Sequence, residues 1–361
     1  MEGLSPGLIA ALCGFAGGVV LGISARWGRF CTLGAIEDAS LGGDFDRLRM
    51  WGLAIAIAIA ATFALDQLGL IQISASFYLN APTTLFATAI GGAIFGLGMA
   101  FVGTCGFGTL ARVGGGDLKS IVTFLVMGIS AYATMSGATA YLRIALFSSN
   151  ERLETSAGFA HSLGALLGLS PFVIACGIAI ALAALCLRSP SFRAQKRYVI
   201  TAAMVGLTIA FGWFGTGYLA FDEFDPVPLE SFRFSAPTGE TIIYVMTMTG
   251  ASLKFGVGAV LGVVVGAAVT ALAQGYFRWE ACDDARELRR QILGGFLMGF
   301  GGVTAVGCTV GQGLSAASTL AYTAPVALAA IYVGAWIGLH LLVHGSVLEP
   351  LRSLFSSHSA H

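Results

Sequence analysis

Residues 91–108 read GGAIFGLGMAFVGTCGFG, and the pattern in this stretch indicates how the whole chain is built. Its spacing, Gly-Gly-x3-Gly-x8-Cys-x2-Gly, recurs in GGVVLGISARWGRFCTLG at 17–34 and in GGFLMGFGGVTAVGCTVG at 294–311. Five fixed positions over 18 residues, three times in one chain, indicate an internal repeat. Each copy predicts a helix with a small-residue face, then a turn that carries the cysteine, then the start of a second helix.

The composition places these repeats in a membrane. Of the 361 residues, 56% are hydrophobic and only 11% are charged, whereas soluble domains carry about 25% charged residues. Apolar runs long enough to span a bilayer lie near 7–25, 50–65, 84–102, 118–137, 171–187, 198–219, 254–273, 291–306 and 323–343. Shorter apolar pieces at 138–147, 160–169 and 241–252 are expected to be half-helices or interfacial helices. The predicted fold class is an all-α polytopic membrane protein, with about nine transmembrane helices and pseudo-symmetric repeats that carry re-entrant cysteine loops.

The chain is expected to form a single membrane domain over 1–361. Its predicted parts are a first repeat half at 1–147, connecting spans and loops at 148–240, a second repeat half at 241–345 and a polar tail at 346–361. Loop charge predicts the orientation, because cytoplasmic loops are enriched in Lys and Arg. The segment 188–197 has four basic residues and no acid, whereas 221–240 has five acids against one arginine. The first is therefore predicted to be cytoplasmic and the second external, which puts loops 26–49 and 274–290 inside.

The repeated cysteines are the strongest candidates for function. A thiol at a helix N-terminus meets free N–H groups and the positive end of the helix dipole, which attract anions. Half-helix ends that point at anionic substrates are a recurring device in transporters. The predicted substrate-path residues are Cys31, Cys105 and Cys308, the turn glycines Gly34, Gly108 and Gly311, and two polar residues that follow the cysteines, Arg112 and Gln312.

Other features narrow the class of protein. The net charge is zero, so no nucleic-acid partner is expected, and no phosphate-binding loop of the Gly-x4-Gly-Lys-Ser/Thr type is present. No cofactor or metal is expected, because neither histidine nor methionine clusters near the cysteines. Glu37 and Asp38 are expected to cap the helix after Cys31 or to pair with arginines such as Arg29, and Lys254 is expected to mark the end of a span.

The cysteine motifs resemble those of the YeeE/YedE family of sulfur transporters. The resemblance rests on RFCTLGA at 29–35, GTCGFGTLAR at 103–112 and GCTVGQGLS at 307–315, and it covers roughly residues 7–343. It implies a bacterial inner-membrane permease that imports thiosulfate for sulfur assimilation and passes it along pore thiols by transient S–H···S contacts. It also implies a separate TusA-like cytoplasmic sulfurtransferase as a possible partner.

Three alternatives remain open at this stage. The substrate could be a related sulfur or selenium compound, since some family members are associated with selenium metabolism. The chain could instead be a membrane thiol enzyme that accepts sulfane sulfur as a persulfide. Three thiols could also carry a soft metal such as Cu(I) or Zn(II).

Overall fold

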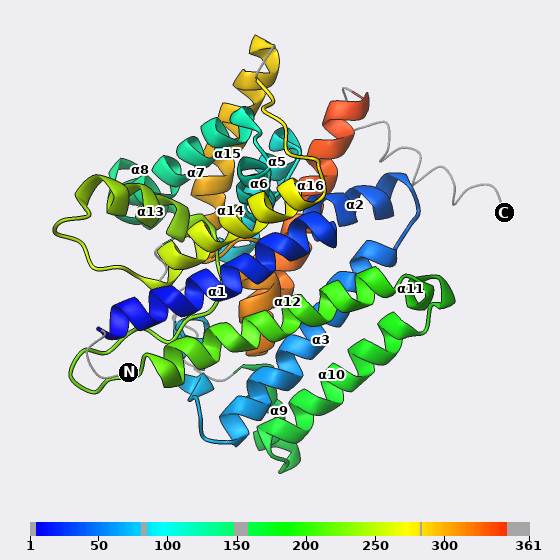
Figure 1. The fold of residues 1–361 in the computed structure, drawn as a ribbon. Coiled ribbons are helices and arrows are strands. Elements are labelled where there is room, and N and C mark those ends of the chain that lie inside the picture. The colour runs from blue at the N-terminus through cyan, green and yellow to red at the C-terminus, as the bar shows by residue number, and fades with distance from the viewer. Residues whose placement is uncertain (1–4, 81–84, 148–157, 282–283, 345–361) are drawn as a thin grey trace.

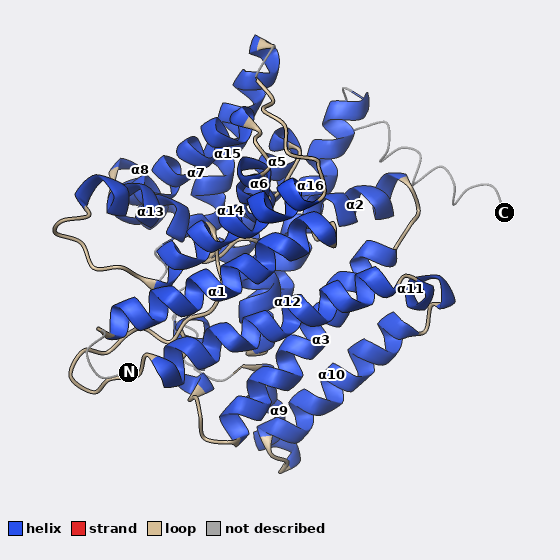
Figure 2. Ribbon diagram, in the orientation of Figure 1, coloured by secondary structure: helices blue, strands red, loops and turns tan. Residues whose placement is uncertain are grey.

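The computed structural model describes residues 5–80, 85–147, 158–281 and 284–344, and within these ranges the chain is helical and without strands (Figure 2). The predicted all-α membrane fold is confirmed. The predicted polar tail at 346–361 lies outside the described residues. In chain order the helices are α1 (Pro6–Trp27), α2 (Thr32–Leu41), α3 (Asp46–Gln67), α4 (Phe77–Asn80), α5 (Leu85–Val102), α6 (Gly106–Gly114), α7 (Leu118–Ser136), α8 (Ala138–Phe147), α9 (Phe159–Leu167), α10 (Pro171–Leu187), α11 (Pro190–Ala194), α12 (Lys196–Phe214), α13 (Ser235–Thr247), α14 (Phe255–Ala273), α15 (Ala285–Thr304) and α16 (Thr323–His344), with a 3-10 turn η1 (Ile73–Ala75) and π-helical turns η2 (Gly215–Leu219) and η3 (Gly311–Ala316).

The number of membrane spans differs slightly from the nine expected. Among the described residues, seven helical segments are long and apolar enough to cross a bilayer, and an eighth is added if α9 and α10, bent by 116°, form one span. The predicted span at 291–306 corresponds to α15, whose first turns are rich in charge (sequence ARELRR). That part of α15 therefore extends beyond an apolar span, and only its later turns are suited to lipid depth.

The helices pack through the glycine faces of the repeats. Helix α1 lies along α14, α5 is held between α15 and α16, and α3 contacts α10 and α12 (Figure 1). Gly18 is so close to α14 that an added Cβ would lie 3.0 Å from the Gly262 Cα, and at Gly92 it would lie 3.1 Å from the Ala327 carbonyl oxygen of α16. This close backbone approach is the role expected of small residues between membrane helices.

The two ends of the helix bundle differ in charge. At one end, Arg26 of α1 donates to the Ala111 carbonyl (3.1 Å), and Ser191 and Gln195 both donate to the Asp46 carboxylate (2.7 and 2.8 Å). This end, called the basic face here, gathers the loops 26–49 and 188–197 and the residues 274–281 and 284–290, which together carry most of the arginines.

The opposite end is called the acidic face here. It holds the segment 221–234, with its carboxylates, against the start of α4, where the Phe77 N–H donates to the Leu229 carbonyl (3.4 Å). Helices α1 and α5 run from the acidic face toward the basic face, and α15 runs the other way. Cys308 therefore approaches the middle of the bundle from the side opposite to Cys31 and Cys105.

Candidate functional site

The three cysteine turns share a backbone feature that the sequence pattern did not predict. Two residues before each cysteine, at Arg29, Gly103 and Val306, the chain adopts a left-handed conformation, with φ of 53°, 77° and 60°. The left-handed region is costly for residues other than glycine, above all for a β-branched one such as valine. The same conformation at the same repeat position shows that the turns are built alike even where no glycine is available.

The predicted half-helices follow each turn. They begin at Thr32, Gly106 and Thr309, and the last of them, helical over residues 309–318, contains the π-helical turn η3. Cys31 and Cys105 occupy the N-cap positions of α2 and α6. The expectation of a thiol at each half-helix start therefore agrees with the structure.

Cys31 and Cys105 lie together. Their side chains interact directly, and the Cys31 Sγ lies 3.7 Å from the hydroxyl of Thr104. Cys105 is fully buried, and its Sγ accepts the Gly108 N–H at 3.3 Å. Cys31 is only partly buried and is therefore the more exposed residue of the pair.

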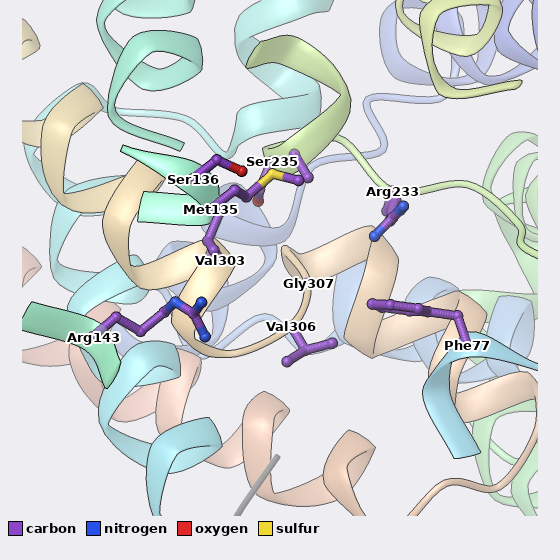
Figure 3. Close-up of a pocket in the computed structure, with 11 residues that line it drawn as sticks. Phe77, Met135, Ser136, Arg143, Arg233, Ser235, Val303, Val306 and Gly307 are labelled. Carbon is purple, nitrogen blue, oxygen red and sulfur yellow. The ribbon is translucent and has the colours of Figure 1, made fainter. Parts of the chain in front are cut away.

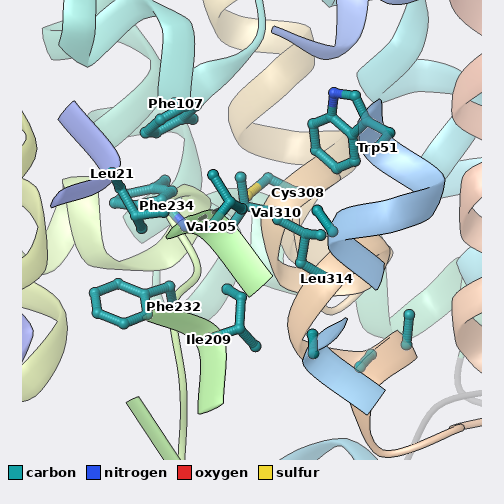
Figure 4. Packing of buried hydrophobic residues seen from close by; sticks show 14 of the residues in the cluster. Leu21, Trp51, Phe107, Val205, Ile209, Phe232, Phe234, Cys308, Val310 and Leu314 are labelled. Atoms are coloured by element: carbon teal, nitrogen blue, oxygen red, sulfur yellow. Dashed lines mark hydrogen bonds between the residues drawn. The ribbon is translucent and has the colours of Figure 1, made fainter. Parts of the chain in front are cut away.

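Cys308 stands apart from this pair and is also fully buried. Its Sγ accepts the backbone N–H of Phe234 at 3.4 Å, and the ring of Phe234 lies 5.4 Å from the ring of Phe107. Phe107 is two residues after Cys105, so the two aromatic rings connect the Cys308 turn with the Cys105 turn (Figure 4). The middle of the molecule is thus closed by packed apolar side chains, with thiols on both sides of the packing.

The glycines three residues after each cysteine allow polar side chains to approach the turns. A side chain at Gly34 would collide with the guanidinium of Arg47, and one at Gly108 would collide with the Thr104 hydroxyl. A Cβ at Gly311 would lie 3.0 Å from the Tyr78 hydroxyl. The predicted path glycines therefore leave room for donor groups beside the thiols.

Arg47 is a site residue that the sequence reasoning missed. Its guanidinium donates to the Asp38 carboxylate (3.0 Å) and to the Arg29 carbonyl (2.9 Å), so it ties α2 to the turn before Cys31. The sequence predicted that the acids of α2 could pair with an arginine, and in the structure Arg47 forms this ion pair with Asp38. In the sequence, Arg47 is one of four arginines in the loop 26–49, and nothing in the repeat marks it.

The two polar path candidates have structural partners. The Gln312 side chain is fully buried, donates to the Ala305 carbonyl (2.7 Å) and accepts from the Thr323 hydroxyl (3.1 Å), so it ties the Cys308 turn to the preceding helix and to α16. The Arg112 guanidinium donates to the Gly103 carbonyl (2.8 Å) and so closes the turn before Cys105. Lys254 precedes α14 and faces Glu240 (3.9 Å), as expected for a residue at the end of a span.

A pocket of about 280 Å³ at the acidic face leads to the Cys308 turn. Its lining includes two arginines, Arg143 of α8 and Arg233, together with Val306 and Gly307 just before the cysteine (Figure 3). The Ser235 side chain also lines it, and the Ser235 hydroxyl is buried without a hydrogen-bond partner among the described residues. Two guanidinium groups and an unpaired hydroxyl are an arrangement suited to an oxyanion. This space is called the outer arginine pocket below.

Arg233 is held at the rim of this pocket by its neighbours. It donates to the Glu230 carboxylate (2.8 Å) and lies over the ring of Phe77, 4.7 Å from the centroid. Burial raises the pKa of the Glu230 carboxyl, and the adjacent Arg233 opposes that rise. Glu230 therefore becomes neutral at a higher pH than an ordinary carboxyl group.

Several buried hydroxyls beside the thiols have no hydrogen-bond partner within the described part of the chain. Thr32 and Thr309 directly follow Cys31 and Cys308, and Tyr78 lies against the Cys308 turn at Gly311. A buried hydroxyl left unpaired costs about 1–3 kcal/mol, so partners are expected from outside the chain. The two threonines can be picked out from the sequence, because a Cys-Thr pair occurs in two of the three copies of the repeat.

The remaining cysteines lie away from the turns. Cys13 and Cys186 are buried in the apolar core, and Cys176 is half-buried on α10. Cys282 lies outside the described residues. No group of three or more His, Cys, Asp or Glu side chains placed to hold a metal ion occurs in the part of the chain that the structure describes.

Comparison with known proteins agrees with this arrangement over nearly the whole chain. A protein called Thiosulfate transporter TsuA, from Spirochaeta thermophila (strain ATCC 700085 / DSM 6578 / Z-1203), is 28% identical over 327 residues, which cover 88% of this chain and 95% of that protein. A second protein of the same name, from Escherichia coli (strain K12), is 27% identical over 352 residues, which cover 90% of this chain and 92% of that protein. A family model described as sulphur transport matches residues 27–337, a range that contains all three cysteine turns. The chain belongs to this sulphur transport family.

Proposed function

We propose that the chain imports thiosulfate across the bacterial inner membrane for sulfur assimilation. The substrate is suggested by the two relatives named as thiosulfate transporters. The observation that carries the proposal is the outer arginine pocket, whose Val306 and Gly307 lead directly into Cys308. The acidic face is external and the basic face is cytoplasmic, since cytoplasmic loops collect Lys and Arg.

Capture of the anion rests on charge. Thiosulfate is a dianion, and desolvating it is costly unless positive groups replace water. Arg143 and Arg233 supply two positive charges, and the Ser235 hydroxyl supplies a further donor. The soft terminal sulfur is then placed toward the Cys308 thiol, which donates a weak S–H hydrogen bond.

Passage then requires the aromatic packing between Cys308 and Cys105 to open. Phe107 and Phe234 separate, and the anion moves to the interacting pair Cys105 and Cys31. Neutral thiols suit this role, because thiolates would repel a dianion. Weak contacts at successive sites favour transit over tight retention. The order of thiols in this proposal is Cys308, Cys105, Cys31.

A separate TusA-like sulfurtransferase at the basic face would receive sulfur from the emerging substrate. Cys31 is the partly exposed residue of its pair, and the Arg29 carbonyl just before it is held by Arg47 of the basic face. Co-purification of the chain with such a protein, retained by wild type and lost when loop residues of the basic face are exchanged, would support this partnership. Uptake at full rate in cells that lack every such protein would contradict it.

The proposal is tested by uptake of labelled thiosulfate into cells without other thiosulfate importers. Wild-type protein is expected to support uptake, and Cys105→Ala and Cys308→Ala at matched expression are expected to abolish it. Cys186→Ala, which changes a core thiol away from the turns, is the control and should retain uptake. Uptake that survives both path substitutions would refute the thiol path. Competition by selenium and other sulfur compounds would decide the substrate range.

A further inference from the structure

A second arginine-lined cavity lies at the basic face and takes no part in the arrangement described above. It has a volume of about 640 Å³ and is lined by Arg26, Arg29, Arg197, Ala271, Gln274 and Tyr276. These residues come from the end of α1, the start of α12 and the end of α14, and α1 packs against both of the other two helices. This space is called the inner arginine cavity.

Two of its guanidinium groups are held in place by neighbouring groups. Arg26 donates to the carbonyls of Ala111 (3.1 Å) and Arg112 (3.4 Å), and Arg197 lies over the ring of Trp27 at 5.6 Å. Such fixed side chains lose little conformational entropy when they bind a ligand. Two of the three guanidinium groups therefore have fixed neighbours before any ligand arrives, whereas Arg29, Gln274 and Tyr276 are exposed.

The charge of the cavity is not balanced by its lining. No carboxylate is among the lining residues, and neither Arg29 nor Arg197 forms an ion pair with another described residue. The acids that act on Arg26 are Asp117 and Glu280, which lie outside the lining. Like charges gathered around one space repel each other until an anion enters.

We propose that the inner arginine cavity is a binding site for a tetrahedral oxyanion of the sulfate, thiosulfate or phosphate class. Three guanidinium groups supply the charge, and the Gln274 amide and the Tyr276 hydroxyl supply neutral donors. Two sources present this chemistry at the inner membrane surface. One is a free anion that leaves the thiol path, and the other is the phosphate of a lipid headgroup.

The position of the cavity favours the free anion. Arg29 is two residues before Cys31, in the left-handed turn whose carbonyl is held by Arg47. An anion that passes Cys31 therefore emerges next to a cavity that carries three positive charges. The idea that the imported anion is released through this cavity rests on the proposed function, whereas binding of an oxyanion in the cavity does not.

The test is binding to the purified full-length chain. Labelled sulfate and thiosulfate would be titrated against wild type, Arg197→Gln, Arg197→Lys and the control Arg193→Gln. Arg193 lies on α11 at the same face and is not part of the cavity lining, so its exchange makes the same change in net charge. Arg197→Gln is expected to weaken binding at one site about tenfold, whereas Arg197→Lys and Arg193→Gln keep it. Native mass spectrometry after reconstitution with phosphatidylglycerol measures how much of this lipid each variant retains.

The two measurements distinguish a free anion from a lipid headgroup as the ligand of the cavity. Loss of sulfate binding in Arg197→Gln alone supports a free-anion site, and loss of retained phosphatidylglycerol in that variant alone supports a headgroup site. Equal behaviour of Arg197→Gln and Arg193→Gln in both measurements overturns the proposal. Sulfate binding at the cavity in a protein that does not take up thiosulfate would leave this site standing and would refute the proposed transport function instead.

Discussion

At the scale of single residues, the unpaired hydroxyls beside the thiols give a sharp test of how the anion is held. Thiosulfate has a soft sulfur end and a hard oxygen end, and a thiol suits only the first. The buried Thr309 hydroxyl has no partner among the described residues and directly follows Cys308, so it is placed to donate to a sulfonate oxygen.

Thr309→Val removes this hydroxyl and keeps the shape of the side chain. A hydrogen bond to a charged group contributes about 1.5–3 kcal/mol, so kcat/KM for thiosulfate uptake is expected to fall about tenfold or more. Thr309→Ser should restore most of the rate. Thr88→Val, at a buried and equally unpaired hydroxyl on α5, serves as the control. An unchanged rate in Thr309→Val would show that this hydroxyl does not meet the substrate.

Glu230 gives a residue-scale prediction about pH. Burial raises the pKa of this carboxyl, so it becomes protonated as the pH falls toward that raised value. Protonation leaves Arg233 without its anionic partner and makes the outer arginine pocket more positive. The KM of wild-type protein for thiosulfate is therefore expected to fall as the external pH is lowered from neutral.

Glu230→Gln should show a low KM across the whole pH range, because its side chain cannot ionise. The matched control is Glu223→Gln, an exposed acid in the same loop region, which should keep the wild-type pH dependence. Initial uptake rates between pH 5 and pH 8 would be measured for all three proteins, with buffers tested for competition. A pH dependence that persists in Glu230→Gln would assign the effect to another group.

At the scale of elements, the turn at the end of α15 is held by a strained residue. Val306 is left-handed, and the next N–H, of Gly307, donates back to the Gly302 carbonyl at 2.8 Å. This is the arrangement in which helices usually end on glycine. Val306→Gly should relieve about 1–2 kcal/mol of strain, whereas Val306→Ala keeps most of the strain and loses packing.

The melting temperature of purified protein measures this difference. Val306→Gly is expected to melt at least a few degrees above Val306→Ala, by roughly 2–4 °C per kcal/mol in a domain of moderate size. The comparison of two small residues at one position separates backbone strain from lost side-chain volume. A higher melting temperature for Val306→Ala would mean that the left-handed turn stores no strain.

The elements also show what the sequence could predict and what it could not. The repeat predicted that a second helix starts just after each cysteine, because cysteine and glycine recur at fixed spacing, and α2, α6 and the helix at 309–318 do start there. The partners of those turns come from elsewhere in the chain. Arg143 and Arg233 are 90 residues apart and lie outside the three cysteine repeats at 17–34, 91–108 and 294–311, so only the packed structure brings them to one pocket.

A local signal for both arginines was nevertheless present. Arg143 interrupts the short apolar piece 138–147, and Arg233 is the one base in an acidic loop. Ionisable residues in such places often mark a substrate path. In the prediction of orientation, Arg233 counts only as one charge of its loop. Gln312 and Arg112 close their turns by donating to backbone carbonyls, and a sequence pattern does not show such contacts.

At the scale of the whole molecule, opposed helix directions give the proposed path two sides. The helices before Cys31 and Cys105 run toward the basic face, and the helix before Cys308 runs toward the acidic face. Packed aromatic rings lie between them, and both Cys105 and Cys308 are fully buried. A small reagent that enters from the basic side should therefore reach the Cys31–Cys105 pair before Cys308, and one that enters from the acidic side should reach Cys308 first.

Single-cysteine variants in sealed vesicles test this arrangement. With a charged, membrane-impermeant thiosulfonate reagent, a chain that retains only Cys308 should react from the acidic face, through the outer arginine pocket. A chain that retains only Cys31 should react from the basic face, and faster, because Cys31 is partly exposed. Thiosulfate should slow both reactions if it occupies the same path. Reaction of both thiols from one face only would mean that the cysteine turns do not divide the membrane between them, and the path proposed here would have to be abandoned.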